Sequence, residues 1–278
     1  SDVCSSDLLT AANYVAKQAA RDGTVIAAGI SNLPTTPLLS PDAAQFDTTK
    51  LSWIGSITKD VFVGFIWNTA PAQTYEQMKT TEVTMGGTAT VGSASFEFAI
   101  LSNALFGTKL KLITGYKDTL ETKLAIEKGE VNGTFANLWG ELKVSRPAWL
   151  KEKKVKVFTQ FGFSKVRDLP DVPLFIDEAK TTADRQALEL LMARQEFAKP
   201  FFGPPDIPDD RVNLLRRGFD ATLKDPAFLA DLAKAQLEAE GPMTGEQLAA
   251  LTGKLMSTPR EVPKRIDAIF SEYRSKKQ

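Results

Sequence analysis

Residues 82–135 read EVTMGGTATVGSASFEFAILSNALFGTKLKLITGYKDTLETKLAIEKGEVNGTF, and they decide the fold class. In this stretch, short strand-like segments alternate with segments whose apolar residues recur at helical spacing. The expected strands are 82–86, 109–114 and 131–135, and the expected helices are 96–106 and 117–128. Such alternation is typical of α/β proteins. The stretch therefore predicts an α/β fold with a mainly parallel sheet.

The alternation continues outside this stretch. A strand that is nearly apolar on both faces is expected at 24–30, with further strands at 51–57 and 60–67. The C-terminal third is predicted to be mostly helical, and a Thr-x-x-Gln capping box at 244–247 marks one helix start. The length of 278 residues suggests two domains. Because no linker is visible, we expect one domain to be inserted into the other.

The composition is that of a folded protein with no charged partner surface. Hydrophobic residues make up 43% and charged residues 24%, close to globular averages. Lys plus Arg number 34 and Asp plus Glu number 34, so no net field favours nucleic acid or an anionic membrane surface. The longest apolar run, 61–67, falls far short of the roughly 20 residues that a membrane span needs. Neither nucleic acid binding nor direct membrane insertion is expected.

Histidine is absent and a single cysteine, Cys4, is present. Imidazole is the usual general base near neutral pH and the commonest metal ligand. Ser-His-Asp and Cys-His catalysis are therefore excluded, as are Cys/His zinc sites and internal disulfides. We expect no metal and no cofactor. Carboxylate, lysine or tyrosine chemistry remains, or no chemistry at all.

A glycine-rich turn at 86–95 joins a predicted strand to a predicted helix. Gly87 and Gly92 have the spacing of a P-loop, but Ser93 stands where a P-loop has its phosphate-binding Lys. Neither G-x-G-x-x-G nor G-x-S-x-G occurs. Backbone N–H groups at a helix start favour an anion, whereas small residues also make ordinary tight turns. Both interpretations stay open from the residues alone.

Two further predicted strands end in polar or aromatic residues before a helix. Tyr116 follows one of them, and Asn137 and Trp139 follow the other. In open α/β sheets, ligands bind outside the carboxyl ends of the strands. The three strand ends, including the glycine-rich turn, are therefore expected to line one cleft. Taken alone, Tyr116 and Trp139 are each also explained as half-buried aromatic residues with a polar tip at the surface.

Four landmark segments occur in order between residue 9 and about residue 270. They are A-x-D-G-T at 20–24, G-Y-K followed by A-I-E-K-G-E-V within 115–131, P-D-V-P at 170–173, and P-P-x-I-P-x-D-R-V at 204–212. Their order and spacing resemble the substrate-binding receptors of tripartite tricarboxylate transporters, the TctC/Bug group. No single segment is diagnostic, but the set covers almost the whole chain.

The resemblance implies a two-lobe, type II periplasmic-binding-protein fold of the Venus-flytrap kind. Lobe 1 is expected to comprise 9–68 and 195–278, and lobe 2 to comprise 69–194. The implied function is that of a periplasmic solute receptor, a monomer and not an enzyme, that captures a small organic carboxylate for membrane transporter subunits. A ligand-sensing ectodomain of a signalling system is the first alternative, and an α/β enzyme without histidine chemistry is the second.

The expected ligand-binding residues lie at strand ends and helix starts, where small polar side chains are otherwise unexplained. They are Ser31, Asn32, Thr88, Thr90, Gly92, Ser93, Ser95, Tyr116 and Asn137. Such a cleft can hold a carboxylate with backbone and hydroxyl donors rather than with a salt bridge.

The chain departs from the family pattern in two places. Many members carry an acid after the strand at 131–135, where this chain has Ala136 and Asn137. The family also begins with a βαβ piece, whereas this chain opens with the polar octapeptide SDVCSSDL. We expect residues 1–8 to be a non-native prefix and the first βαβ piece to be missing.

Overall fold

The computed structural model describes residues 2–88, 93–235 and 239–275. Contacts divide the chain into two units, and each unit combines segments that are distant in the sequence. Unit 1 is Ser1–Asp60 with Leu190–Pro263, and unit 2 is Val61–Glu189 with Lys264–Gln278. The chain therefore passes between the units three times, after Asp60, Glu189 and Pro263, and the insertion of one domain into the other stays a prediction.

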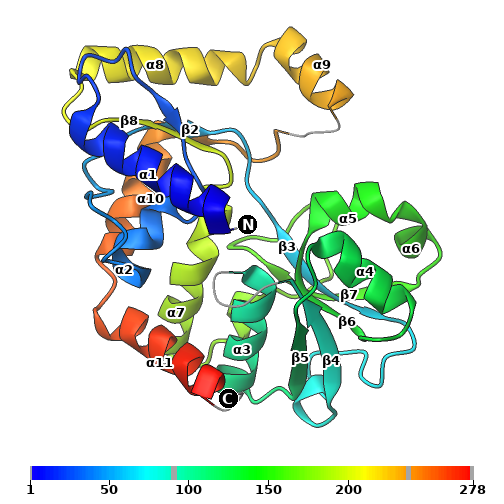
Figure 1. The fold of residues 1–278 in the computed structure, drawn as a ribbon. Coiled ribbons are helices and arrows are strands. Elements are labelled where there is room, and N and C mark those ends of the chain that lie inside the picture. Colours follow the sequence, from blue (N-terminus) through cyan, green and yellow to red (C-terminus); the bar gives the residue numbers. More distant parts are fainter. Residues whose placement is uncertain (1, 89–92, 236–238, 276–278) are drawn as a thin grey trace. The chain divides into compact units, whose positions relative to one another are not determined.

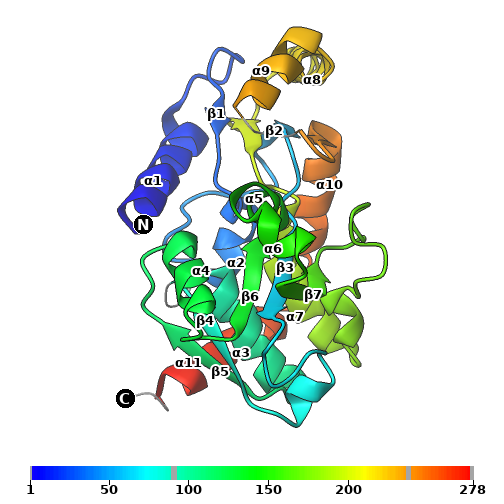
Figure 2. The same cartoon turned by 90° about the vertical axis from the view of Figure 1, so that its right-hand side faces the viewer.

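The unit boundaries differ from the expected lobes mainly at the C-terminus. The expectation assigned all of 195–278 to lobe 1, but residues from Lys264 onward group with unit 2. The reason is aromatic packing, because Phe270 and Tyr273 of helix α11 (Glu261–Ser275) lie 6.2 Å and 5.4 Å from the ring of Phe96. Helix α11 ends beside α3 (Ala94–Phe106) in both views (Figures 1 and 2).

Unit 1 contains a sheet of short strands in the order β1–β8–β2–β9. The strands are β1 (Ala27–Ala28), β2 (Ser52–Ser56), β8 (Pro200–Gly203) and β9 (Met243–Thr244). All three strand pairs are antiparallel. The expected parallel order is wrong here, because periodicity records which residues are buried but not which way a neighbouring strand runs. The expected strand at 24–30 is reduced to the two residues that pair with β8.

The helices of unit 1 are α1 (Asp2–Gln18), α2 (Thr36–Leu39), α8 (Asp209–Thr222), α9 (Pro226–Lys234) and α10 (Gly245–Met256). Of these, α8 and α10 pack against strand β2 of the sheet. The capping box at Thr244 and Gln247 is present at the start of α10. Fully buried Trp53 lies at the core, where its ring contacts Phe197 and Phe202 and its Nε1 donates to the Thr48 carbonyl at 3.0 Å.

Helix α1 begins at Asp2 and ends at Gln18, so residues 2–8 lie in the same helix as the residues that follow them. The expectation that they are a non-native prefix, and that a βαβ piece is missing before them, stays a prediction.

Unit 2 is built on a five-stranded sheet in the order β5–β4–β6–β3–β7. The strands are β3 (Phe62–Trp67), β4 (Val83–Gly87), β5 (Leu110–Thr114), β6 (Gly133–Leu138) and β7 (Val155–Phe161). Strand β4 is parallel to β5 and β6, whereas β3 is antiparallel to β6 and β7. The sheet is thus mixed rather than mainly parallel. The α/β class predicted from 82–135 is confirmed.

Helices pack on both faces of the unit 2 sheet. They are α3, α4 (Thr119–Glu127), α5 (Trp139–Ser145) and α6 (Pro147–Lys151), while α7 (Thr182–Met192) runs through the unit boundary. Strand β4 lies between β5 and β6, so the connection through α3 to β5 and the connection through α4 to β6 run in opposite directions along the sheet. Right-handed crossovers then place α3 and α4 on opposite faces (Figure 1).

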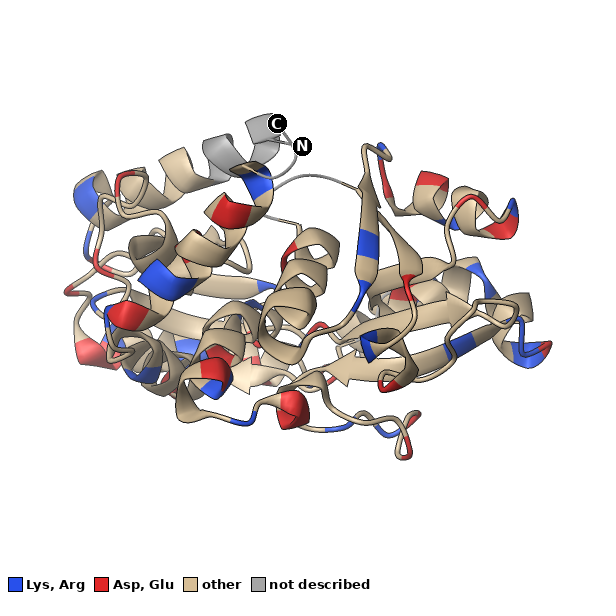
Figure 3. Ribbon diagram, turned by 90° about the horizontal axis from the view of Figure 1, so that it is seen from below, with Lys and Arg blue, Asp and Glu red and all other residues tan. Residues whose placement is uncertain are grey.

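Charged residues of both signs occur in each unit. Lys and Arg are interspersed with Asp and Glu along the ribbon of each unit (Figure 3). Within the part of the chain that the structure describes, no helix has both the length and the apolar character to cross a membrane.

An aromatic cluster fills the core of unit 2. Phe175, which is fully buried, lies at its centre. Its ring contacts those of Tyr75, Phe98, Phe106, Phe135 and Phe161. These contacts join α3, β6 and β7 to the segment before α7, and therefore fix the strands whose ends carry the pocket described below.

Replacing this ring should destabilise the protein strongly. We expect Phe175→Ala to lower the free energy of unfolding by about 3–5 kcal/mol, because a buried ring is lost and a cavity remains. Phe163→Ala, whose side chain is 38% exposed, serves as the control and should cost less than about 1 kcal/mol. Urea denaturation measures both, and equal losses would contradict a central role for Phe175.

Candidate functional site

A pocket of about 150 Å³ lies within unit 2, at the carboxyl ends of β4 and β6 and the amino ends of α3 and α4. A cavity of similar size in another protein holds a ligand as large as benzene. Eight of the twelve residues that line the pocket have hydroxyl, amide or ammonium side chains. These are Thr88, Ser93, Ser95, Thr119, Thr122, Thr134, Asn137 and Lys123, with Phe62, Gly87, Ala94 and Ala136 between them.

Two glycines at the end of β4 allow the helices to approach the strand. A Cβ on Gly86 would lie 2.8 Å from Thr122 Cγ2, and a Cβ on Gly87 would lie 3.2 Å from Ser95 Oγ. A Cβ contact of 2.8 Å is essentially never seen in proteins, and a Cβ contact of 3.2 Å is shorter than most. Any side chain at Gly86 would therefore push α4 away from the pocket wall.

The first turn of α3 presents hydrogen-bond donors to the pocket. Ser93 is the N-cap, in an extended conformation, and its Oγ accepts from the Phe96 N–H at 3.4 Å. The N–H groups of Ala94 and Ser95 precede the first intrahelical donor, the Glu97 N–H, which bonds the Ser93 carbonyl at 3.0 Å, so the helix itself supplies them with no acceptor. The helix dipole adds a partial positive charge at this end. Together with the Ser95 hydroxyl, 3.5 Å from Ser93 Oγ, these donors suit a carboxylate.

The amino end of α4 is different, because it carries its own carboxylate. Asp118 is the N-cap, and its side chain accepts from the Glu121 N–H at 2.8 Å. A second anion at this helix start would be repelled by Asp118. The first turn of α3 also holds a carboxylate, that of Glu97, but its N-cap is the neutral Ser93, so of the two helix starts α3 is the one whose cap does not compete with an anion.

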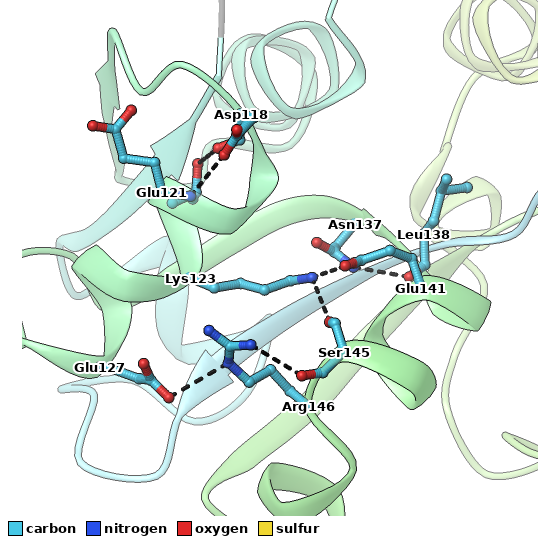
Figure 4. Close-up of polar contacts among 10 residues, drawn as sticks. Asp118, Glu121, Lys123, Glu127, Asn137, Leu138, Glu141, Ser145 and Arg146 are labelled. Carbon is cyan, nitrogen blue, oxygen red and sulfur yellow. Dashed lines mark hydrogen bonds and ion pairs between the residues drawn. The ribbon is translucent and has the colours of Figure 1, made fainter.

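Lys123 of α4 lines the pocket with a side chain that is only 1% exposed. Its Nζ contacts the Glu141 carboxylate of α5 very closely and donates to Ser145 Oγ at 2.8 Å (Figure 4). Burial lowers the pKa of the Lys123 ammonium, and the Glu141 carboxylate opposes this effect. Burial also acts to raise the pKa of Glu141, but the hydrogen bonds from Lys123, Asn137 and Ser145 outweigh it and lower that pKa.

Asn137 joins the same network from the end of β6. Its side chain is 3% exposed, and its Nδ2 donates to the Leu138 carbonyl at 2.8 Å and to Glu141 Oε2 at 3.1 Å. Glu141 therefore accepts from both Lys123 and Asn137, and the ion pair ties α4, α5 and the end of β6 together (Figure 4).

The structure brings together some of the predicted ligand-binding residues. Thr88, Ser93, Ser95 and Asn137 line the pocket. Tyr116 packs instead against the apolar cluster around Trp139 and Trp149. Ser31 and Asn32 belong to unit 1, where Asn32 precedes a short 3₁₀ helix. Thr90 and Gly92 lie outside the described residues.

Lys123 and Glu141 were missed by sequence reasoning. The sequence gives no local signal for Lys123, because only the structure shows that Thr122, Lys123, Ala125 and Ile126 form the buried face of α4, where a charge needs a partner. Nothing in the sequence identifies Glu141 as that partner. Across residues 2–88, 93–235 and 239–275, no group of three or more His, Cys, Asp or Glu side chains could hold a metal ion.

The ion pair should make stability depend on pH in a defined way. Glu141→Gln leaves the Lys123 ammonium without an anionic partner. We expect a loss of about 1–3 kcal/mol in the free energy of unfolding at about pH 7, less than the 3–5 typical of fully buried pairs because the Glu141 side chain is 37% exposed. A carboxylate with a lowered folded pKa stabilises above its unfolded pKa, here near 4.5, and stops doing so as the pH falls through the folded value.

The difference between wild type and Glu141→Gln should therefore shrink once the pH falls below about 4.5. Urea denaturation over a pH series measures it. The control is Glu130→Gln, since the Glu130 side chain is 52% exposed and lies 4.0 Å from Lys128. A difference for Glu141→Gln that stays constant down to about pH 3 would contradict the stabilising ion pair.

No protein-family model and no curated protein matches the chain. Solved structures do resemble it. A TctC solute-binding protein from Polaromonas is 14% identical, with 96% of this chain and 83% of that chain covered and a TM-score of 0.68. The periplasmic binding protein BugD is 18% identical, with 94% and 83% covered and a TM-score of 0.56.

A third similar structure is MatC from Rhodopseudomonas palustris with bound malate. It is 17% identical, with 94% of this chain and 84% of that chain covered and a TM-score of 0.55. The likeness extends over both units of the chain and over most of each of these proteins. The chain therefore has the fold of the TctC- and Bug-type solute-binding proteins.

Proposed function

We propose that the protein is an extracytoplasmic receptor that binds a small organic carboxylate in the unit 2 pocket. The observation that carries this proposal is the amino end of α3, where Ser93, Ser95 and the first N–H groups of the helix meet the pocket. Helix amino ends and hydroxyl donors bind carboxylates without a counter-ion. The pocket volume of about 150 Å³ suits a small acid.

The fold supports delivery to a membrane transporter. Structures that share it include a TctC solute-binding protein, the periplasmic protein BugD, and MatC with malate. By analogy, we place the protein in the periplasm, as a monomer that passes its ligand to the membrane subunits of a tripartite tricarboxylate-type transporter. Ser31 and Asn32 of unit 1, and Tyr116, stay predictions as ligand contacts.

We propose that binding occurs without turnover. Lys123 is the one amine among the described pocket residues, and a lysine nucleophile must be able to lose its proton. Burial lowers the pKa of the Lys123 ammonium, but its Nζ is already engaged by Glu141 and Ser145 and is not free to attack a ligand. The same contacts keep Glu141 ionised and occupied. Lys123 and Glu141 therefore act as a structural pair rather than as a base or nucleophile.

A ligand screen tests the proposal directly. Propionate, succinate, malate and citrate are added separately to the full chain, and the melting temperature and any chemical conversion are recorded. A ligand at 100 times its Kd should add about 2.7 kcal/mol to the free energy of unfolding. Stabilisation without conversion supports a receptor. Conversion of a stabilising acid would indicate an enzyme, and no stabilisation by any acid would contradict carboxylate binding.

Removing one donor should weaken binding of whichever acid binds. We expect Ser95→Ala to raise the Kd about tenfold, which corresponds to about 1.4 kcal/mol for a lost hydroxyl–carboxylate hydrogen bond. Ser164→Ala, on an exposed loop residue of unit 2, is the matched control and should leave the Kd unchanged. Calorimetric titration measures both variants, and an unchanged Kd in Ser95→Ala would remove the amino end of α3 from the site.

A further inference from the structure

The amide of Asn137 has a fixed orientation. An asparagine NH₂ group has two hydrogens, and here one goes to the Leu138 carbonyl at 2.8 Å and the other to Glu141 Oε2 at 3.1 Å. A carbonyl oxygen and an ionised carboxylate can only accept. Rotating the amide by half a turn would place its oxygen against two acceptors, so the reverse orientation is excluded.

Glu141 holds this orientation because it is itself held in place. Its carboxylate contacts the Lys123 ammonium, whose side chain is almost completely buried. Hydrogen bonds from Lys123, Asn137 and Ser145 outweigh the effect of burial and keep the pKa of Glu141 low, so that it remains an acceptor at neutral pH. The positive and negative charges of the pair also cancel near the amide.

Asn137 therefore offers the pocket an acceptor and no donor. The side chain lines the pocket, both of its N–H groups are used within the protein, and Oδ1 is the polar atom left for a ligand. A second carboxylate at this wall would face an oxygen and gain no hydrogen bond. A ligand hydroxyl would donate to Oδ1 and satisfy it.

The pocket thus has two chemically different walls. The wall formed by the first turn of α3 donates hydrogen bonds, whereas the wall formed by Asn137 accepts one. We infer, on the basis of the proposed function, that the preferred ligand is a hydroxy acid, whose carboxylate binds at α3 and whose hydroxyl donates to Asn137 Oδ1. An ammonium is disfavoured relative to a hydroxyl, because one neutral acceptor does not compensate for burying a charge beside an already paired Lys123 and Glu141.

Matched ligands measure this preference without reference to absolute affinity. Calorimetric titrations compare malate with succinate and lactate with propionate, and aspartate and alanine form the amino arm. In the wild type, the hydroxylated member should bind about tenfold more tightly or better, because its analogue leaves Asn137 Oδ1 buried without a donor. The amino member should bind more weakly than the hydroxylated one.

Two variants assign the preference to Asn137 and its orientation. In Asn137→Ala, the ratio of Kd values between the plain and hydroxylated acids should fall to about one, whatever the change in the Kd of the plain acid itself. In Glu141→Gln, the new amide can donate to Asn137 Oδ1 and permit the reverse orientation, so the ratio should fall several-fold. Ser95→Ala is the matched control, because it should weaken both members of a pair equally and leave their ratio unchanged.

The outcomes separate this inference from the proposed function. If no acid of any pair binds, the proposed function is wrong. If plain and hydroxylated acids bind equally, or if the ratio survives in Asn137→Ala, carboxylate binding stands and the role of Asn137 is wrong. Should Asn137→Ala fail to fold, the ratio in Glu141→Gln decides, and an unchanged ratio there overturns the inference.

Discussion

A lysine ammonium that is 1% exposed requires a carboxylate partner, and the meeting of Lys123 with Glu141 organises unit 2 around its pocket. The charges come from different helices, α4 and α5, which flank strand β6 in the sequence. Isolated burial of either charge would cost several kcal/mol, so the pair forms only when both helices are docked. Docking in turn places Asn137 against Glu141. One electrostatic requirement therefore orders three elements of the pocket wall.

The glycines at the end of β4 meet a steric requirement that complements the ion pair. The ion pair holds the amino-terminal half of α4 in place, and Gly86 leaves the space that Thr122 needs beside the strand. Gly87 does the same for Ser95 on the opposite face of the sheet. Helices on both faces can then bring their first turns to one strand end. A pocket lined by two helix starts depends on the absence of side chains at this point.

Sequence reasoning captured local features and missed those that depend on tertiary contacts. The alternation within 82–135 predicted β4, α3, β5, α4 and β6, because the spacing of apolar residues along the chain differs between a helix and a strand. The direction of the strands in unit 1 could not be predicted from the sequence, because β2 pairs with β8, which is more than a hundred residues away along the chain. Ser93 and Ser95 were found because a strand end before a helix is a local signal. Lys123 resembled its exposed neighbours Lys117 and Lys128 until Glu141 was placed beside it.

Under the proposed function, the distribution of charge around the pocket bears on how strongly a bound carboxylate would be held. A free cation facing the ligand would make charge-assisted hydrogen bonds roughly twice as strong as neutral ones. Here Lys123 is already neutralised by Glu141. A ligand carboxylate would therefore interact with hydroxyl groups and with the partial positive charge at the amino end of α3. These donors do not titrate near neutral pH, and the chain has no histidine. The affinity for a carboxylate would then rest on these weaker interactions and would not change with pH near neutrality. The selectivity between acids would come from the orientation of the neutral Asn137 amide.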